Sequence, residues 1–163
     1  CSIPKVAMIM GVCVGGGLEV AGLCDIRICG ESSRFGAPVS KLGLVMGYQE
    51  IGALKDLVGA SGALEILLEG RIIDAPEALR KGIVSRVVAD DEVEAEAMAT
   101  ARRIADGAPL VHRWHRKFLA RLADPKPLSD EEVKEAYACY DTEDFKTGYQ
   151  AFLDKKKPDF KGR

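Results

Sequence analysis

Residues 4–29 of the chain, PKVAMIMGVCVGGGLEVAGLCDIRIC, decide how it folds. Residues 4–10 are a short apolar run bounded by proline and glycine, which predicts a buried strand. Three consecutive glycines follow at 15–17, and residues 18–23 then favour a short apolar helix. Residues 26–29 predict a second strand. A strand, a glycine turn, a helix and another strand in this order predict a layered α/β fold with a sheet and outer helices.

The chain downstream of this stretch continues the alternation of strands and helices. Residues 35–38 are predicted as a turn or loop. Two helices are expected at 49–58 and 61–68, and each is followed by a glycine that ends it. Asp74 has a glutamate three residues later, which marks a helix start, and residues 83–88 predict a further strand.

After Asp90 the pattern becomes almost wholly helical. Ser129 with Glu132 predicts a capping box, and Thr142 predicts another helix start. We therefore expect residues 1–89 to form part of an α/β core. Residues 90–163 are expected to form a helical region that packs on that core or carries an oligomer interface.

The composition is typical of a soluble globular protein of one-domain length, with 163 residues, 47% hydrophobic and 29% charged. A formal charge of -2 gives no basic footprint for nucleic acid. No apolar run approaches the roughly 20 residues that cross a bilayer, so no membrane partner is expected. The chain begins at Cys1 without a methionine, which suggests that sequence upstream of it is missing.

The five cysteines are odd in number and follow no zinc-binding spacing. This usage predicts a reduced, cytoplasmic protein. His112 and His115 lie three residues apart on one side of a predicted helix. Without a third ligand in the pattern we interpret them as part of a solvated basic face, and we predict no metal site.

The glycine row Gly15, Gly16 and Gly17 stands between a strand and a helix, so a ligand can approach the backbone closely. A helix that begins there presents free N–H groups and the positive end of its dipole, which stabilise an anion. The anion is either a phosphate or the oxyanion of an activated thioester. Neither nucleotide motif fits, because Val20 stands where one needs glycine and no Gly-Lys-Ser/Thr follows.

Glu19 falls in the first turn of the same predicted helix, and two interpretations are open. It is either an acidic residue that favours a helix N-terminus or a general acid/base beside an oxyanion site. Its apolar neighbours Leu18, Val20 and Ala21 favour the second.

An ordered series of segments resembles the signature of the enoyl-CoA hydratase/isomerase (crotonase) family and covers nearly the whole chain. The segments are GGGLEVAGLCDIRI at 15–28, RFGAP at 34–38, LGL at 42–44, LEILLEGR at 64–71, residues 74–88, and the end from 142 to 155.

The resemblance implies a crotonase-like fold and an acyl-CoA thioester as substrate, with no cofactor beyond the coenzyme A of that substrate. It assigns one oxyanion N–H to Gly16 and matches Glu19 to the first catalytic glutamate of the hydratases. The second oxyanion N–H comes from a turn upstream of Cys1. Gly15, Gly17 and Gly47 are expected to border the substrate, and Lys155 to approach the coenzyme A. A trimer or dimer of trimers is implied, with the region after residue 90 at the interface.

One departure from the family pattern concerns the second catalytic glutamate, whose position is occupied here by Val39. Valine cannot hold or transfer a proton, whereas hydration uses two carboxylates around one water. We hypothesise that Tyr48 or Glu50, at positions where the family commonly has bare backbone, supplies the missing group. The alternative is that both residues only start the helix that follows.

Two functions from different classes therefore remain open. The first is an enzyme in which Gly16 stabilises a thioester enolate and Glu19 transfers protons. The second is a non-catalytic acyl-CoA-binding or assembly subunit, which the substitution at Val39 favours and the retained glycine row opposes.

Overall fold

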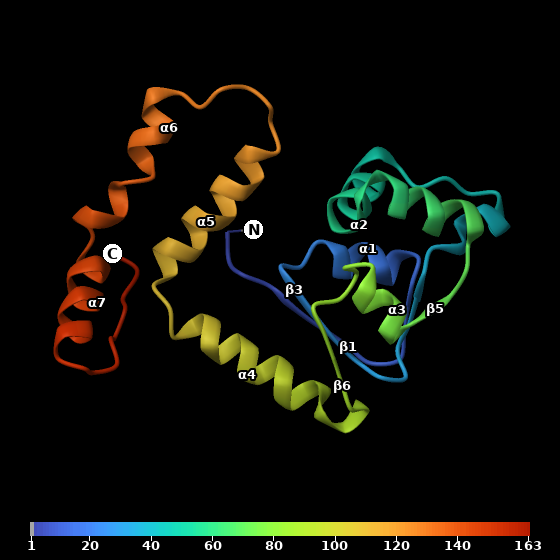
Figure 1. The fold of residues 1–163 in the computed structure, drawn as a ribbon, viewed down its shortest axis with the longest axis horizontal. Coiled ribbons are helices and arrows are strands. Elements are labelled where there is room, and N and C mark those ends of the chain that lie inside the picture. The colour runs from blue at the N-terminus through green and yellow to red at the C-terminus, as the bar shows by residue number, and fades with distance from the viewer. Residues whose placement is uncertain (1) are drawn as a thin grey trace. The chain divides into compact units, whose positions relative to one another are not determined.

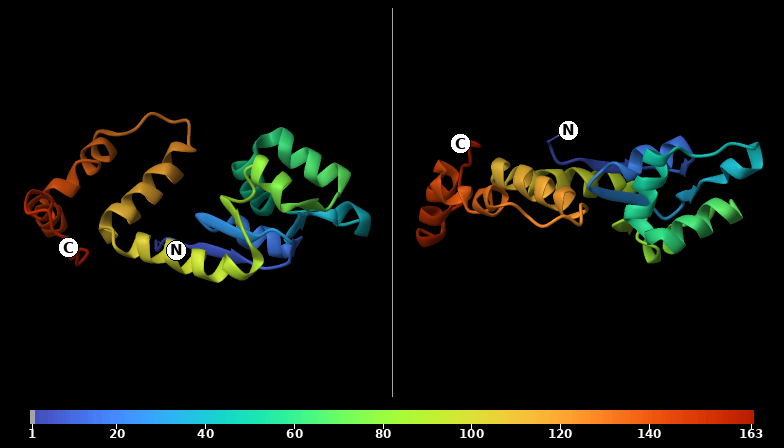
Figure 2. Two further views of the ribbon diagram at one scale, coloured as in Figure 1. Left: turned by 60° about the horizontal axis from the view of Figure 1, so that its bottom comes forward. Right: turned by 90° about the horizontal axis from the view of Figure 1, so that it is seen from above.

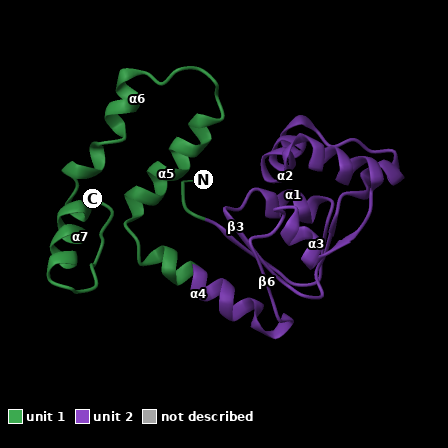
Figure 3. Cartoon of the chain, viewed as in Figure 1, with its two compact units in different colours: residues 1–4, 101–163 green, residues 5–100 purple. Residues whose placement is uncertain are grey.

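The computed structural model describes residues 2–163 and divides the chain into two compact units (Figure 3). One unit is Lys5–Thr100. The other is Ala101–Arg163 together with the residues before Lys5.

The first unit contains a three-stranded parallel sheet in the order β1-β3-β6 (Figure 1). Its strands are β1 (Val6–Ile9), β3 (Ile26–Gly30) and β6 (Arg86–Val88). Ile28 lies opposite Met8 on one side and Arg86 on the other. The predicted strands at 4–10 and 26–29 are confirmed as β1 and β3, and the strand predicted at 83–88 is shorter.

A second three-stranded sheet has the order β2-β4-β5. It is formed by β2 (Val12–Val14), β4 (Arg34–Gly36) and β5 (Ile73–Asp74), with β2 and β4 parallel and β4 and β5 antiparallel. The prediction of a turn or loop at 35–38 was therefore partly wrong, because β4 includes Phe35 and Gly36. These strands have two or three residues each, so they show no alternating pattern that a sequence could reveal.

The helices of this unit begin and end close to the glycine and capping residues expected from the sequence. Those that lie wholly within it are α1 (Gly16–Gly22), α2 (Tyr48–Glu69) and α3 (Ala75–Arg80). α2 is interrupted at Gly59, whose φ of 71° and ψ of 170° are not helical, and Gly70 ends it at φ 55°. The two helices predicted at 49–58 and 61–68 are thus confirmed as the two arms of α2, because glycine adopts these dihedral angles without a steric penalty.

The core of this unit lies between the sheets and the three helices. Its fully buried side chains include Phe35 on β4, Ile28 and Cys29 on β3, and Ile83 before β6. Arg27 is also buried, and its Nε donates a hydrogen bond to the carbonyl of Ile83 at 2.7 Å. A buried guanidinium with a carbonyl partner satisfies its polar group and ties β3 to the segment before β6.

The remaining helices are α4 (Val93–Ala105), α5 (Pro109–Leu122), α6 (Asp130–Glu135) and α7 (Glu143–Leu153), with short 3₁₀ turns at Pro38–Leu42, Asp90–Glu92 and Ala138–Asp141. The boundary between the two units falls inside α4. An extended segment joins α5 to α6, as the orange part of the chain in Figure 2 shows.

The predicted helix starts are confirmed by their hydrogen bonds. Asp74 accepts from the N–H of Glu77 at 2.9 Å, and Thr142 accepts from the N–H of Phe145 at 3.0 Å. Ser129 and Glu132 form both halves of a capping box. Each side chain satisfies an N–H that has no partner within its helix.

The end of the chain is held against α7. Asp144 is buried, and its carboxylate accepts from the N–H groups of Lys161 at 2.7 Å and Gly162 at 2.9 Å. Its own N–H donates to the carbonyl of Arg163 at 3.0 Å. The carboxylate thus replaces water for two backbone donors of the final residues.

Two glycines give a matched test of packing in the first unit. A Cβ on Gly36 would lie 2.5 Å from the carbonyl oxygen of Arg71, whereas a Cβ on Gly52, inside α2, would meet nothing within 4 Å. We expect Gly36→Ala to lower the free energy of unfolding by about 1–3 kcal/mol. Gly52→Ala should raise it by about 0.5–1 kcal/mol. Urea unfolding followed by circular dichroism measures both, and equal effects would contradict this account of β4.

Candidate functional site

The glycine row lies where β2 passes into α1. Gly15 has φ 50° and ψ -124°, a conformation that side-chain-bearing residues rarely adopt. Its N–H donates to the carbonyl of Gly36 at 2.9 Å, which fixes the turn to β4. The chain can therefore leave a strand and start a helix at once.

The backbone at the start of α1 is open to a ligand. The first N–H to bond within the turn is that of Glu19, which donates to the carbonyl of Gly15 at 3.1 Å. The N–H groups of Gly16 and Gly17 come before it and have no partner within the helix. A Cβ on Gly15, Gly16 or Gly17 would meet nothing within 4 Å. The backbone here is accessible to an oxyanion.

Glu19 is half-buried and lines a narrow pocket between α1 and α2. The pocket has space for about one water molecule. Its lining consists of Leu18, Glu19, Gly22, Met46, Glu50, Ala53, Leu54 and Leu57. The only ionisable side chains in this lining are the two glutamates.

Glu50 reaches this pocket from the first turn of α2. Its Oε2 lies 2.5 Å from the position that a Cβ on Gly47 would occupy, so the carboxylate folds back over Gly47. The structure thus brings together Glu19 and Glu50, which the sequence had separated by 31 positions. Tyr48 is 97% exposed and does not line the pocket.

Val39 lies in the 3₁₀ turn after β4, half-buried, and packs against the hydrophobic core. Its side chain is thus accommodated by apolar contacts.

Lys155 belongs to the other unit, where it lies two residues after the end of α7 and has a positive φ of 54°. Its side chain is exposed, and its assignment to coenzyme A stays a prediction.

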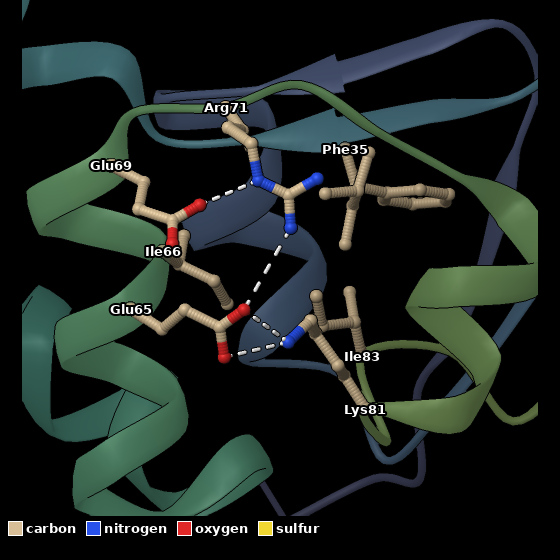
Figure 4. Close-up of a pocket in the computed structure, with 9 residues that line it drawn as sticks. Phe35, Glu65, Ile66, Glu69, Arg71, Lys81 and Ile83 are labelled. Carbon is tan, nitrogen blue, oxygen red and sulfur yellow. Dashed lines mark hydrogen bonds and ion pairs between the residues drawn. The ribbon is translucent and has the colours of Figure 1, made fainter.

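A second pocket, which could not be predicted from the sequence, lies between α2, β4, β5 and the residues that follow α3 (Figure 4). Lys81 donates to both carboxylate oxygens of Glu65, at 2.8 and 2.7 Å. Arg71 pairs with Glu69 at 2.5 Å and with Glu77 at 2.9 Å. These charges are paired with one another, so the cluster joins the end of α2 to α3 and leaves no group free for chemistry.

His112 connects two helices of its unit. Its Nε2 lies 2.9 Å from the carbonyl of Ile104 and, as N–H, donates to it, which packs α5 against the end of α4. Within residues 2–163, no cluster of three or more His, Cys, Asp or Glu side chains could hold a metal ion. Within the same range, every helix is too short or too polar to cross a bilayer.

Two cysteines near the glycine row are buried thiols. Burial raises the pKa of Cys13, and it raises the pKa of Cys29 to about 11. A thiol with a raised pKa carries little of the nucleophilic thiolate at neutral pH. Cys13 and Cys29 therefore act as apolar core residues.

The geometry defines a class of protein: a layered α/β protein with a glycine-opened helix start that can receive an anion beside carboxylates. Comparison with known proteins gives the family. The family model for enoyl-CoA hydratase/isomerase matches residues 1–163. The chain belongs to the enoyl-CoA hydratase/isomerase family.

Individual relatives support the assignment to this family. The chain is 38% identical, over 165 residues, to an Arabidopsis thaliana protein named probable enoyl-CoA hydratase 2, mitochondrial, covering 99% of this chain and 54% of that protein. A crystal structure of an enoyl-CoA hydratase/carnithine racemase from Magnetospirillum magneticum is 52% identical with a TM-score of 0.98, covering 100% of this chain and 61% of the other. An enoyl-CoA hydratase/isomerase family protein from Hyphomonas neptunium is 34% identical with a TM-score of 0.93, covering 99% and 62%.

These matches confirm the crotonase-like fold expected from the resemblance. The chain spans between half and two thirds of the length of these relatives.

The ion-pair cluster predicts a pH dependence of stability. The hydrogen bond from Lys81 lowers the pKa of Glu65 below its ordinary value of 4.5. A lowered pKa in the folded state gives stability that is present above about pH 4.5 and is lost as the pH falls further. We expect Glu65→Gln to lower the melting temperature at pH 7, with the gap to wild type closing below pH 4.5. Glu94→Gln, an exposed position on α4, is the control. A gap that persists at pH 3 would contradict the assignment.

The buried thiols predict selective labelling. We expect N-ethylmaleimide at pH 7.5 to modify the partly exposed Cys139 and to leave Cys29 unmodified, because burial of Cys29 raises its pKa to about 11. Labelling of Cys29 should appear only after unfolding in denaturant. Peptide mapping by mass spectrometry measures both sites, and equal native labelling would show that Cys29 is accessible.

Proposed function

We propose that the protein is an enzyme that acts on acyl-CoA thioesters, of the hydratase/isomerase type that its family comprises. Its relatives carry the name enoyl-CoA hydratase, which supports the substrate class. The observation that carries the proposal is the position of Glu19. It lies in the turn that the glycine row opens and lines a pocket with space for about one water molecule.

In this proposal the N–H of Gly16 donates to the thioester carbonyl oxygen. The oxygen gains negative charge as the thioester becomes an enolate, so the hydrogen bond strengthens in the transition state. Gly15 and Gly17 leave space beside this donor, because a Cβ at either position would point into open space. The substrate can thus lie directly against the backbone.

Glu19 transfers the proton at the carbon next to the thioester carbonyl. Negative charge on that carbon is delocalised onto the carbonyl oxygen, which is held by the backbone donor. Glu19 lies three residues after Gly16, on the same first turn of α1. One short element therefore supplies both the anion-stabilising donor and the proton-transfer group.

A second candidate is a non-catalytic acyl-CoA-binding or assembly subunit. The specific observation in its favour is Val39, an apolar core contact at the family's second glutamate position. Such a subunit would bind acyl-CoA through the glycine row and turn over none.

Replacement of Glu19 separates the two candidates. We expect Glu19→Gln in the complete protein to lower turnover of crotonyl-CoA and of a 3-enoyl-CoA by about 100-fold or more, because a positioned acid/base contributes about 10²–10⁴-fold. Acyl-CoA binding, measured by calorimetry, should change little. The spectroscopic assay of the enoyl thioester gives the rates.

Glu94→Gln is the matched control, since it makes the same change on an exposed face of α4. Binding without turnover of either substrate by the wild-type protein would establish the non-catalytic subunit instead.

A further inference from the structure

We infer that Glu50 is the second carboxylate of the site and that Glu19 and Glu50 together hold the water that is added to the substrate. The inference rests on the proposed function and extends it to hydration. The family position for this carboxylate is Val39, which has no proton to give or take.

The pocket between α1 and α2 fits this role. Glu19 enters from α1 and Glu50 from α2, and the space between the helices accommodates about one water molecule. The other lining side chains are apolar, from Leu18, Met46, Ala53, Leu54 and Leu57. Glu19 and Glu50 are the two ionisable side chains among the lining residues, so we assign them as the partners of the water, since a buried water needs two or more polar partners.

The other candidates for the second group are placed elsewhere. Val39 packs against the hydrophobic core, and Tyr48 is 97% exposed. Tyr48 and Glu50 are the two residues hypothesised to replace the missing glutamate. Of these two, only Glu50 lines the same pocket as Glu19.

Gly47 leaves room for the Glu50 carboxylate. Because Oε2 of Glu50 lies 2.5 Å from the place of a Cβ on Gly47, any larger residue there would displace the carboxylate. Glu50 also lies in the first turn of α2, where a negative charge interacts favourably with the helix N-terminus. Its position is thus set by the backbone of its own helix.

The chemical step divides between the two groups. Glu50 takes a proton from the water, and the oxygen of that water forms a bond to the β-carbon of the enoyl thioester. The electron pair of the double bond moves to the thioester oxygen, held by the N–H of Gly16. Protonated Glu19 then gives its proton to the α-carbon as the carbonyl re-forms. A proton returns from Glu50 to Glu19 through solvent, so water is added and nothing else is consumed.

The division of labour gives a test with two readouts in the complete protein. The first is hydration of crotonyl-CoA, which needs both carboxylates. The second is exchange of the α-hydrogens of butyryl-CoA with D₂O, followed by NMR, which needs only the oxyanion donor and Glu19. We expect Glu50→Gln to lower hydration about 100-fold or more and to leave exchange within about threefold of wild type. Glu19→Gln should lower both.

A rescue variant makes the test specific for the carboxylate. Val39→Glu restores a carboxylate at the family position, so Val39→Glu combined with Glu50→Gln should hydrate at least tenfold faster than Glu50→Gln alone. Gly47→Ala should slow hydration in the wild type, because a Cβ at this position would displace the Glu50 carboxylate. Glu94→Gln is again the unaffected control.

The outcomes separate this inference from the proposed function. Wild-type hydration that Glu50→Gln leaves unchanged, or a loss of exchange equal to the loss of hydration, would overturn the role of Glu50 and leave Glu19 in place. A double variant no faster than Glu50→Gln alone would also overturn it. A wild-type protein that neither hydrates nor exchanges would overturn the proposed function itself.

Discussion

The turn at Gly15 is the constraint on which the site depends. A φ of 50° at this residue, with its N–H bonded to the carbonyl of Gly36, lets the chain change from β2 to α1 without an intervening loop. A residue other than glycine held in such a sparsely populated φ/ψ region costs about 1–3 kcal/mol. Gly36 itself fits closely against the backbone of Arg71. One tight junction thereby fixes the helix start, and with it the direction of the free N–H groups.

The packing of α1 against α2 determines where Glu19 and Glu50 lie. α1 and α2 lie against each other, and a Cβ added to Gly22 would already touch Leu57 at 3.5 Å. Each helix begins directly after a glycine, Gly15 for α1 and Gly47 for α2, and each presents a glutamate from its first turn. Helices and strands hold reacting groups in place more precisely than loops do. The pocket between the two helices is therefore a consequence of how their starts are aligned.

Much of this architecture could be predicted from the sequence, because its signals are local. Gly59 breaks a helix, Asp74 caps one, and the glycine row precedes another, and each feature depends on residues a few positions apart. The short strands of the second sheet could not be predicted, since two or three residues carry no period. That Glu19 and Glu50 line one pocket could not be predicted either, because it depends on tertiary packing between α1 and α2. Assembly as a trimer or dimer of trimers rests on the resemblance and stays a prediction.

The number of carboxylates at the pocket decides which reaction the fold can perform. One carboxylate beside an oxyanion donor can move a proton to and from the α-carbon, because the negative charge stays on the held oxygen. Hydration requires a second proton-transfer group, because it forms bonds at two carbons and also activates a water. Val39 removes the second group from the turn after β4, where its side chain now contributes to the core. Glu50, at the start of the neighbouring helix, lines the same water-sized pocket as Glu19. The role proposed for Glu50 would give the site a second carboxylate in spite of Val39, and Gly47 leaves room for that side chain because it has no Cβ.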